Sequence, residues 1–154
     1  MTVSPIQTGI AWDTGSRNQT NIADSAASAS CTNTQKLVAL GSRFAAANAA
    51  NNYKPTGTPS EKSWCLPSYD LLNSINNSTN LAKINTAITT AGGTKLGYGG
   101  QPSYSYESVW SSSEYVFTDG AWYLYVSTSS SSHMDGNGRN NSSINYTVRP
   151  VLEF

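Results

Sequence analysis

The last third of the chain alternates apolar and polar residues with a period of two, and this pattern constrains it to β-strands. The alternation begins near Ser108, and residues 146–154 have the pattern of a closing strand whose terminal residue is docked in the fold. Between them, Asp119-Gly120 is a strong signal for a tight hairpin turn, because both central positions of such a turn need positive φ. We therefore expect a hairpin followed by a further strand at the end of the sequence.

The strand after this turn has two chemically different faces. Side chains alternate along a strand, so its even-numbered residues share one face and its odd-numbered residues share the other. The even-numbered set is apolar and comprises Trp122, Leu124 and Val126. The odd-numbered set includes Tyr123 and Tyr125. We expect the first set to lie in the core and the two tyrosine rings to point outward.

The first two thirds of the chain carry the spacing of three and four between apolar residues that is typical of helices. The first predicted helix begins at Asn33 or Thr34, where a polar side chain can cap it, and fades near Asn52. Its buried positions are expected to be Leu37, Leu40 and Phe44. Before this helix, residues 10–13 have the apolar character of an early strand, and residues 14–32 are predicted to be a loop.

Two further helices are predicted, one capped by Ser68 and one beginning near Asn80. Their expected buried positions are Leu71, Leu72, Ile75, Leu81, Ile84 and Ile88. Gly92-Gly93 ends the last helix, since glycine accepts the left-handed conformation found after helix ends. The segment 96–106, rich in Gly, Tyr, Ser and Pro, is predicted to be irregular. The sequence thus predicts one α+β domain over residues 1–154, with helices first and a sheet last.

Length and charge exclude several classes of protein. A chain of 154 residues is long enough to bury one core. Nine basic residues balance nine acidic ones, so no net field attracts nucleic acid or an anionic membrane. No apolar stretch approaches the roughly 18 residues of a membrane span, and no signal peptide is visible at the start of the sequence. We expect no nucleic-acid partner and no membrane span.

The C-terminal region lacks three residue types. Residues 1–114 contain twelve Lys, Glu or Gln; at that frequency the 38 residues from Tyr115 to Leu152 would hold about four, and they hold none. Tyr, Ser, Thr, Asn, Asp and Gly fill the region, a mixture typical of adaptable contact surfaces, although a solvated hairpin with incidental tyrosines would have the same composition. The candidate contact residues are Tyr115, Val116, Phe117, Thr118, Asp119, Tyr123, Tyr125, Ser130, Ser132, His133, Asp135 and Asn137.

Four segments carry a resemblance to a known family. They are Trp64-Cys65-Leu66-Pro67-Ser68, Val109-Trp110-Ser111-Ser112-Ser113-Glu114, Ala121-Trp122 and Val148-Arg149-Pro150-Val151. Through these segments, which cover about residues 62–154, the chain resembles the variable proteins of diversity-generating retroelements. The resemblance implies a C-type lectin fold of the formylglycine-generating-enzyme type, in which helices pack on a twisted antiparallel sheet.

The resemblance also implies a function. In such proteins, adenine-directed mutagenesis rewrites Asn-type codons near the C-terminus, and the rewritten codons cannot encode Lys, Glu, Gln, Met or Trp. Residues from about 115 to 147 would be the diversified binding region, with Trp122 and Met134 as fixed positions. The implied partner is a protein or glycan on a target cell surface, bound without cofactor, metal or catalysis. The implied location is a phage tail or a bacterial cell surface, and the alternative is a non-diversified lectin-like adhesin that binds carbohydrate.

Calcium-dependent lectins and enzymes are the competing classes. A calcium site needs several oxygen ligands, usually including carboxylates, but Gln101-Pro102-Ser103 lacks the acid expected by analogy with lectins. Cys31 and Cys65 lie outside the C-terminal region in which a formylglycine-type cysteine pair would be placed. His133 has Asp135 nearby but no third metal ligand, and its serine and glycine neighbours indicate a mobile loop. We therefore expect no catalytic residues and no metal site.

Three further expectations concern structural residues. Cys31 and Cys65 either form a disulfide or are buried reduced thiols, because pairing cannot be read from spacing alone. Arg149 is expected to form a structural ion pair with a carboxylate such as that of Glu114. The tryptophans expected in the core are Trp12, Trp64 and Trp110.

Overall fold

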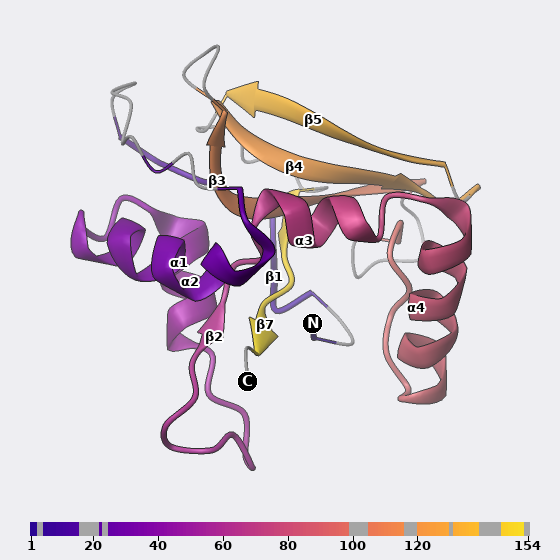
Figure 1. The fold of residues 1–154 in the computed structure, drawn as a ribbon, viewed down its shortest axis with the longest axis horizontal. Coiled ribbons are helices and arrows are strands. Elements are labelled where there is room, and N and C mark those ends of the chain that lie inside the picture. Colours follow the sequence, from indigo (N-terminus) through magenta and orange to yellow (C-terminus); the bar gives the residue numbers. More distant parts are fainter. Residues whose placement is uncertain are drawn as a thin grey trace.

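The computed structural model describes residues 1–2, 5–15, 22, 25–98, 105–115, 120–129, 131–138 and 146–152. Over these ranges the chain has a mixed α+β architecture with four α-helices, a five-stranded sheet and a separate two-stranded sheet. Most of the helical residues precede the long strands in the sequence, as predicted (Figure 1). The α+β expectation is therefore confirmed.

The main sheet has the strand order β1-β6-β3-β4-β5. Its strands are β1 (Gln7–Thr8), β3 (Tyr106–Tyr115), β4 (Gly120–Ser127), β5 (Ser132–Gly138) and β6 (Tyr146–Val148). The sheet is mixed: β3 and β6 are parallel, and the antiparallel arrangement expected from the resemblance holds for the other three pairs of neighbouring strands. The small sheet pairs β2 (Trp64–Cys65) with β7 (Val151–Leu152) in antiparallel fashion.

The predicted hairpin is present, but its connection differs from the prediction. Gly120 is the first residue of β4 and pairs with Tyr115, the last residue of β3. Residues 116–119 connect the two strands and lie outside the described residues. The Asp119-Gly120 pair is therefore not a two-residue turn, because Gly120 already belongs to the ladder.

The helices are α1 (Ser30–Ala39, after a 3₁₀ turn at Ala27–Ala29), α2 (Ala45–Asn52), α3 (Tyr69–Ser74) and α4 (Ser78–Thr90). Ser68 caps α3 as predicted, its Oγ accepting a hydrogen bond from the Leu71 N–H. Asn77 caps α4 in the same way, three residues before the predicted start. The α4 helix ends as predicted, with Gly92 at φ 74° and the Gly93 N–H bonded to the Ile88 carbonyl.

The first predicted helix is two helices. The α1 helix starts at Ser30, so Asn33 and Thr34 lie inside it and do not cap it. Gly41 adopts φ 120° between α1 and α2, a conformation that favours glycine and interrupts the helix. Because of this break, Leu40 is 54% exposed instead of buried.

Residues 10–13 are buried but form no strand, so this prediction is wrong. Two indole hydrogen bonds, and no strand ladder, link this segment to β3. Trp110 Nε1 donates to the Ile10 carbonyl at 2.8 Å, and Trp12 Nε1 donates to the Ser111 carbonyl at 2.7 Å. Trp12 and Trp110 are core residues as predicted, whereas Trp64 is only half-buried.

The serine run 111–113 forms an irregularity in β3, where the pairing with β4 is interrupted between Trp110 and Glu114. All three serines are buried, and neighbouring segments bind to them. The Ser112 N–H donates to the Pro67 carbonyl at 2.8 Å, and the Tyr69 N–H donates to Ser113 Oγ at 3.1 Å. Small side chains here let the segment that precedes α3 approach the strand closely.

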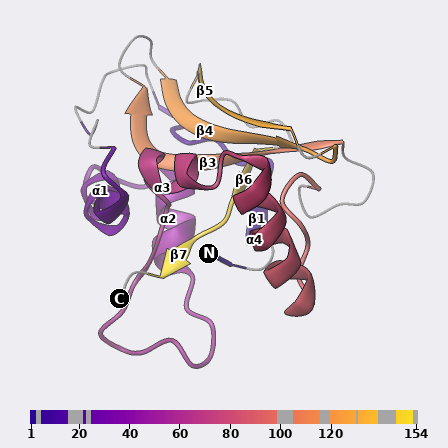
Figure 2. The same ribbon diagram turned by 45° about the vertical axis from the view of Figure 1, so that its right-hand side comes forward.

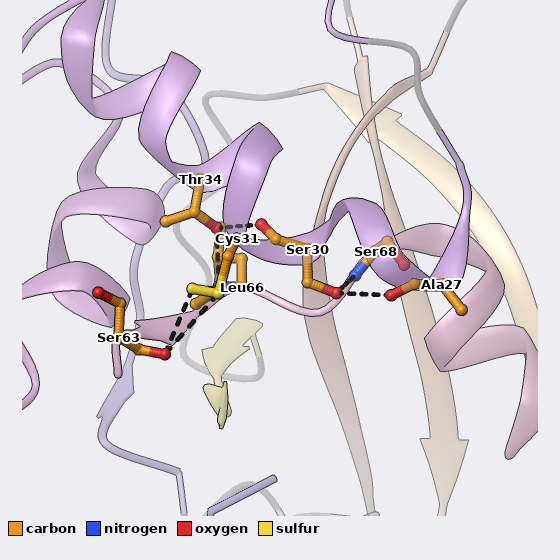
Figure 3. Close-up of a disulfide and its surroundings, with 8 residues drawn as sticks. Ala27, Ser30, Cys31, Thr34, Ser63, Leu66 and Ser68 are labelled. Carbon is orange, nitrogen blue, oxygen red and sulfur yellow. Dashed lines mark hydrogen bonds between the residues drawn. A yellow bond between two sulfur atoms is a disulfide. The ribbon is translucent and has the colours of Figure 1, made fainter. Parts of the chain in front are cut away.

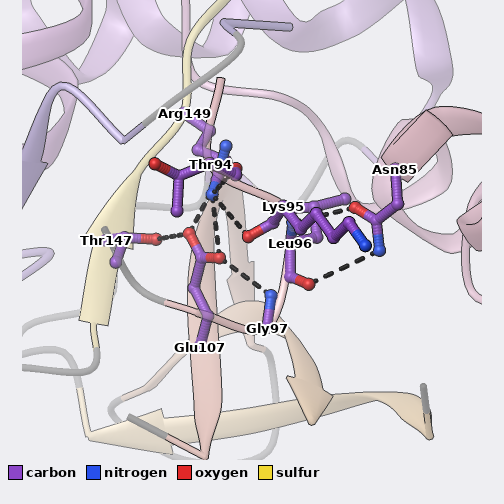
Figure 4. Close-up of polar contacts among 8 residues, drawn as sticks. All are labelled: Asn85, Thr94, Lys95, Leu96, Gly97, Glu107, Thr147 and Arg149. Carbon is purple, nitrogen blue, oxygen red and sulfur yellow. Dashed lines mark hydrogen bonds and ion pairs between the residues drawn. The ribbon is translucent and has the colours of Figure 1, made fainter. Parts of the chain in front are cut away.

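The predicted closing strand over 146–154 is divided into β6 and β7 by Arg149 and Pro150; residues 153–154 lie outside the described part. Proline has no N–H to contribute to a ladder, which ends β6 there. Arg149 is fully buried and pairs with Glu107, not with Glu114, at 2.6 Å between Nε and Oε1 (Figure 4). Glu107 is the partner because it lies on β3 close to the β6 pairing, whereas Glu114 is at the other end of β3.

Apolar residues cover both faces of the main sheet. Trp110 on one face belongs to a cluster with residues of α1 and α2, and its neighbour Val109 on the opposite face belongs to a cluster with residues of α3 and α4. Figures 1 and 2 show α3 and α4 on the same side of the ribbon formed by β3, β4 and β5. The even-numbered face of β4 packs on this helical side, with Leu124 and Val126 fully buried, as predicted.

Cys31 on α1 and Cys65 on β2 form a disulfide with Cα atoms 4.9 Å apart (Figure 3). Two hydroxyl groups of α1 strengthen the same connection. The Leu66 N–H donates to Thr34 Oγ1 at 2.9 Å, and the Ser68 N–H donates to Ser30 Oγ at 3.0 Å. The question that the sequence left open is thus answered in favour of the bridge.

We predict that Glu107→Ala lowers the free energy of unfolding by about 3–5 kcal/mol, because Arg149 would keep a buried charge without its carboxylate partner. Urea denaturation followed by circular dichroism measures the change. Glu61→Ala, at an exposed acid, is the control and should change stability by less than about 0.5 kcal/mol. A similar small effect for Glu107→Ala would contradict the structural role of the pair.

We predict that replacing both Cys31 and Cys65 by serine lowers the free energy of unfolding by about 2–4 kcal/mol, since the bridge closes a loop across 34 positions of sequence. Denaturation of the wild type with and without a reducing agent should reproduce this difference, and the agent should not affect the double variant. Equal stability of reduced and oxidised wild type would show that the bridge does not constrain the chain.

Candidate ligand-binding surface

Three aromatic side chains stack across β3, β4 and β5 on one face of the sheet. Tyr125 pairs directly with His133, and their ring centroids are 4.7 Å apart at an interplanar angle of 26°. Tyr106 stacks on the same Tyr125 ring at 5.2 Å and 24°. His133 is exposed, and both tyrosines are half-buried. We call Tyr106, Tyr125 and His133 the ring column.

Two members of the ring column, Tyr125 and His133, are predicted from the sequence, and Tyr106 is not. The composition of residues 96–106 predicts an irregular segment, but β3 begins at Tyr106. Its position two residues before Ser108 puts it on the same strand face as Ser108, which pairs with Tyr125. Extending the period-two pattern back by one repeat would have found it.

His133 belongs to β5 and not to a mobile loop, so that prediction is wrong. The strand β5 pairs with β4 from Gly120↔Gly138 to Val126↔Ser132. The serine and glycine residues that favoured a loop are accommodated because hydrogen bonds to β4 hold the strand. The imidazole therefore has a fixed place in the sheet.

Tyr123 is 7% exposed, so the expectation that its ring points into solvent is wrong. The ring does lie on the same face as Tyr125, but Trp110 of β3 and Tyr146 of β6 cover it, with centroids 5.8 and 5.2 Å away. Its hydroxyl donates a hydrogen bond to the exposed Asp135 carboxylate at 3.0 Å. Tyr123 thus orients the Asp135 carboxylate through this hydrogen bond, and its own ring is too buried to contact a ligand.

The phenol of Tyr123 is held in its protonated form. Burial raises its pKa well above the usual range. The adjacent Tyr146 and the Asp135 carboxylate raise the pKa further, because deprotonation would remove the hydrogen bond to Asp135 and place a second negative charge beside that carboxylate. At neutral pH the hydroxyl is therefore a permanent donor that orients the carboxylate.

Tyr115 lies in a different cluster on the opposite face of the sheet. Its ring meets the Trp122 ring edge-on at 4.5 Å, and Trp122 also contacts Tyr69 of α3 at 4.6 Å. All three rings are half-buried, so Trp122 is not the fully buried residue expected. The Tyr115 ring lies over Gly136, where a Cβ atom would be 2.5 Å from Tyr115 Cγ.

The predicted contact residues thus do not form one continuous surface. Tyr125, His133 and Asp135 share one face. Ser132 pairs with Val126 and lies on the face of the sheet that α3 and α4 cover, as Tyr115 does. The side chain of Asn137 lies outside the described part, as do the following residues entirely: Val116, Phe117, Thr118, Asp119 and Ser130.

The face that carries the ring column offers ring surfaces for stacking, hydrogen-bonding groups, the imidazole of His133 and the carboxylate of Asp135. The described residues contain no cluster of three His, Cys, Asp or Glu side chains that could hold a metal ion. Both cysteines are occupied by their disulfide. Contact through ring surfaces, hydroxyl groups, imidazole and carboxylate is what this geometry supports.

We predict that Tyr123→Phe changes the response of stability to alkaline pH. Below about pH 10, the usual tyrosine pKa, folded and unfolded chains both keep this proton. Above it only the unfolded chain releases the proton, so the free energy of unfolding of the wild type falls. The variant has no such proton and should lose only the bond to Asp135, about 1 kcal/mol, near neutral pH.

The stability difference between wild type and Tyr123→Phe should therefore narrow between about pH 8 and pH 11. Urea denaturation at a series of pH values measures it. Groups that do not contact Tyr123 contribute equally to both proteins and cancel in the difference. A difference that stays constant or widens would show that Tyr123 is not shielded in the folded chain.

Comparisons of the chain with protein-family models, with curated proteins and with solved structures find no significant match. Within the described residues, none of the helices has the length and apolar character needed to cross a membrane. The function is therefore inferred from the resemblance given above and from the geometry of the sheet.

Proposed function

We propose that this protein binds a ligand through the face of β4 and β5 that carries the ring column, on a C-type lectin fold of the formylglycine-generating-enzyme type. The observation that carries the proposal is the cross-strand stack of Tyr106, Tyr125 and His133, flanked by the exposed Asp135 carboxylate. It presents aromatic area beside hydrogen-bonding groups on paired strands. Side chains held in this way lose little conformational freedom when a partner binds.

The diversified character of this region is part of the proposal. The absence of Lys, Glu and Gln from residues 115–152 supports it, since these residues cannot be encoded at the rewritten codons of a diversity-generating retroelement. The arrangement of β5 supports it too: backbone hydrogen bonds to β4 hold the strand, so exposed side chains such as that of His133 can change without loss of the ladder. In this proposal a constant backbone displays variable contacts.

The Cys31–Cys65 bridge supports a location outside the reducing cytosol. A phage tail or a bacterial cell surface satisfies this condition. The proposed partner is a protein or glycan on a target cell. The alternative is a non-diversified lectin-like adhesin that binds carbohydrate. The exposed imidazole of His133 and the half-buried phenol of Tyr125 favour it, because both can form hydrogen bonds with sugar hydroxyls.

We predict that Tyr125→Ala combined with His133→Ala weakens binding at least tenfold, because the half-buried Tyr125 ring and the exposed His133 ring would both be lost. An array of target-cell surface proteins and glycans identifies the partner, and titration calorimetry gives the Kd of wild type and variant. Leu40→Ala, an exposed apolar position on a different element, is the matched control and should leave Kd unchanged. Unchanged binding in the double variant would refute the assignment of this face.

The sequence around the gene separates the two functions. A nearly identical downstream repeat that differs only at adenines, next to a reverse transcriptase, is expected for a diversified protein. A ligand bound through the ring column in the absence of such a repeat would favour the constant adhesin.

A further inference from the structure

A concave surface that shares no residue with the ring column lies where α2, β2 and the N-terminal segment meet. Its volume is about 730 Å³, and its walls include Gln7, Asn52, Tyr53 and Trp64. Sites for small molecules typically enclose about 300–1,000 Å³ and combine an apolar lining with a few polar groups. We call this surface the α2–β2 groove.

Two aromatic rings form a fixed corner of the α2–β2 groove. Tyr53 follows the last residue of α2, and Trp64 is the first residue of β2. Their centroids are 5.2 Å apart and their planes are inclined by 77°, so the edge of one ring meets the face of the other. Trp64 Nε1 donates to Thr58 Oγ1 at 2.9 Å, which fixes the orientation of the indole. Both rings are half-buried and therefore keep surface for a ligand.

The backbone below this corner is held from two sides. Trp64 pairs with Leu152 of β7, and the next residue, Cys65, is bridged to Cys31 of α1 (Figure 3). The corner is therefore part of the covalently fixed region of the fold. Such preorganisation reduces the entropy that a ligand must overcome on binding.

Neutral hydrogen-bonding groups accompany the rings. Gln7 and Asn52 expose amide side chains, each with donors and an acceptor. Thr2, also in the wall, has a buried Oγ1 without a hydrogen-bond partner. Amide and hydroxyl groups of this kind can pair with a ligand group that both donates and accepts.

The charges of the walls restrict the class of ligand. The described residues that line the groove include no Asp, Glu, Lys, Arg or His side chain. Met1 is also in the wall, and burial lowers the pKa of its α-amino group and so disfavours the charged form. A phosphate or carboxylate would thus find no charged side chain of opposite sign, and a wholly apolar ligand would cover the amides without pairing them. A hexose ring has an apolar face for the indole and hydroxyls for the amides. We infer that the α2–β2 groove binds a neutral sugar unit.

Tryptophan fluorescence can report on this groove separately from the cluster of Tyr69, Tyr115 and Trp122. Trp12 and Trp110 are buried, whereas Trp64 and Trp122 are both half-buried. In a Trp122→Phe protein, a ligand-dependent change in tryptophan fluorescence therefore reports on Trp64. The probes are the neutral trisaccharides of glucose, mannose, galactose and N-acetylglucosamine, with glucose 6-phosphate as the charged counterpart.

At least one neutral trisaccharide is expected to give a saturable change, and glucose 6-phosphate none. Asn52→Ala should raise the Kd of that sugar about tenfold, the effect of losing one well-placed hydrogen bond. Trp64→Phe should abolish the signal, and calorimetry should show weaker binding as well. Asn52 is exposed, so its variant keeps the test valid even if Trp64→Phe disturbs folding.

Tyr125→Ala is the matched control, because it alters the ring column and leaves the groove intact. Sugar binding that survives Tyr125→Ala but is weakened by Asn52→Ala supports the inference whether or not the proposed function is correct. The inference is overturned if none of the trisaccharides changes Trp64 fluorescence at about 10 mM, or if Asn52→Ala leaves Kd unchanged. Preferential binding of glucose 6-phosphate would overturn it as well.

Discussion

The buried ion pair between Glu107 and Arg149 is the interaction on which the arrangement of both sheets depends. Arg149 joins β6 of the main sheet to β7 of the small sheet, and Glu107 lies in β3. The carboxylate also accepts bonds from Thr147 Oγ1 and the Gly97 N–H, and the guanidinium donates to the carbonyls of Thr94 and Lys95 (Figure 4). Two charges without solvent are tolerated only when they are paired and hydrogen-bonded to this extent.

This pair also explains why a parallel strand can sit beside β3. The parallel contact between β3 and β6 is short, with Ser108 opposite Tyr146 and Val109 opposite Thr147. So short a ladder contributes few hydrogen bonds of its own. Side-chain bonds from Thr147 Oγ1 and from Arg149 Nε to the Glu107 carboxylate add to this short ladder.

The ring column is continuous with the hydrophobic core, because Tyr125 packs against the core cluster. Within that cluster, Tyr146 and Trp110 stack at 4.5 Å and both contact Tyr123. Burial decreases along β4, from Tyr123 to the half-buried Tyr125, and reaches exposure at His133 in β5. Rigidity at the surface is thus inherited from packing beneath it.

Local signals were sufficient for the features that depend on neighbours in sequence. The cap at Ser68, the helix end at Gly92 and the faces of Leu124 and Val126 follow from short-range chemistry, and all were predicted. Burial of Tyr123 was not predictable in this way, because the rings that cover it come from other strands.

The same limit applies to several charged, polar and irregular features. The partner of Arg149 depends on the pairing of β3 with β6, and the placement of His133 depends on hydrogen bonds to β4. The Ile10 carbonyl accepts a hydrogen bond from the Trp110 indole, 100 positions away in the sequence, which no local pattern reveals. Of the candidate binding surface, the sequence identified Tyr125, His133 and Asp135, and the third dimension added Tyr106.

The contact between Tyr115 and Gly136 has a consequence for how the hairpin region can evolve. The ring occupies the space that any other side chain at position 136 would need, so a bulky group at 115 and a side chain at 136 exclude one another. Variation at these two sites is therefore coupled: a codon change that removes the glycine would be tolerated only alongside a smaller residue at 115. The number of residue combinations tolerated at positions 115 and 136 is therefore smaller than the product of the numbers tolerated at each position alone.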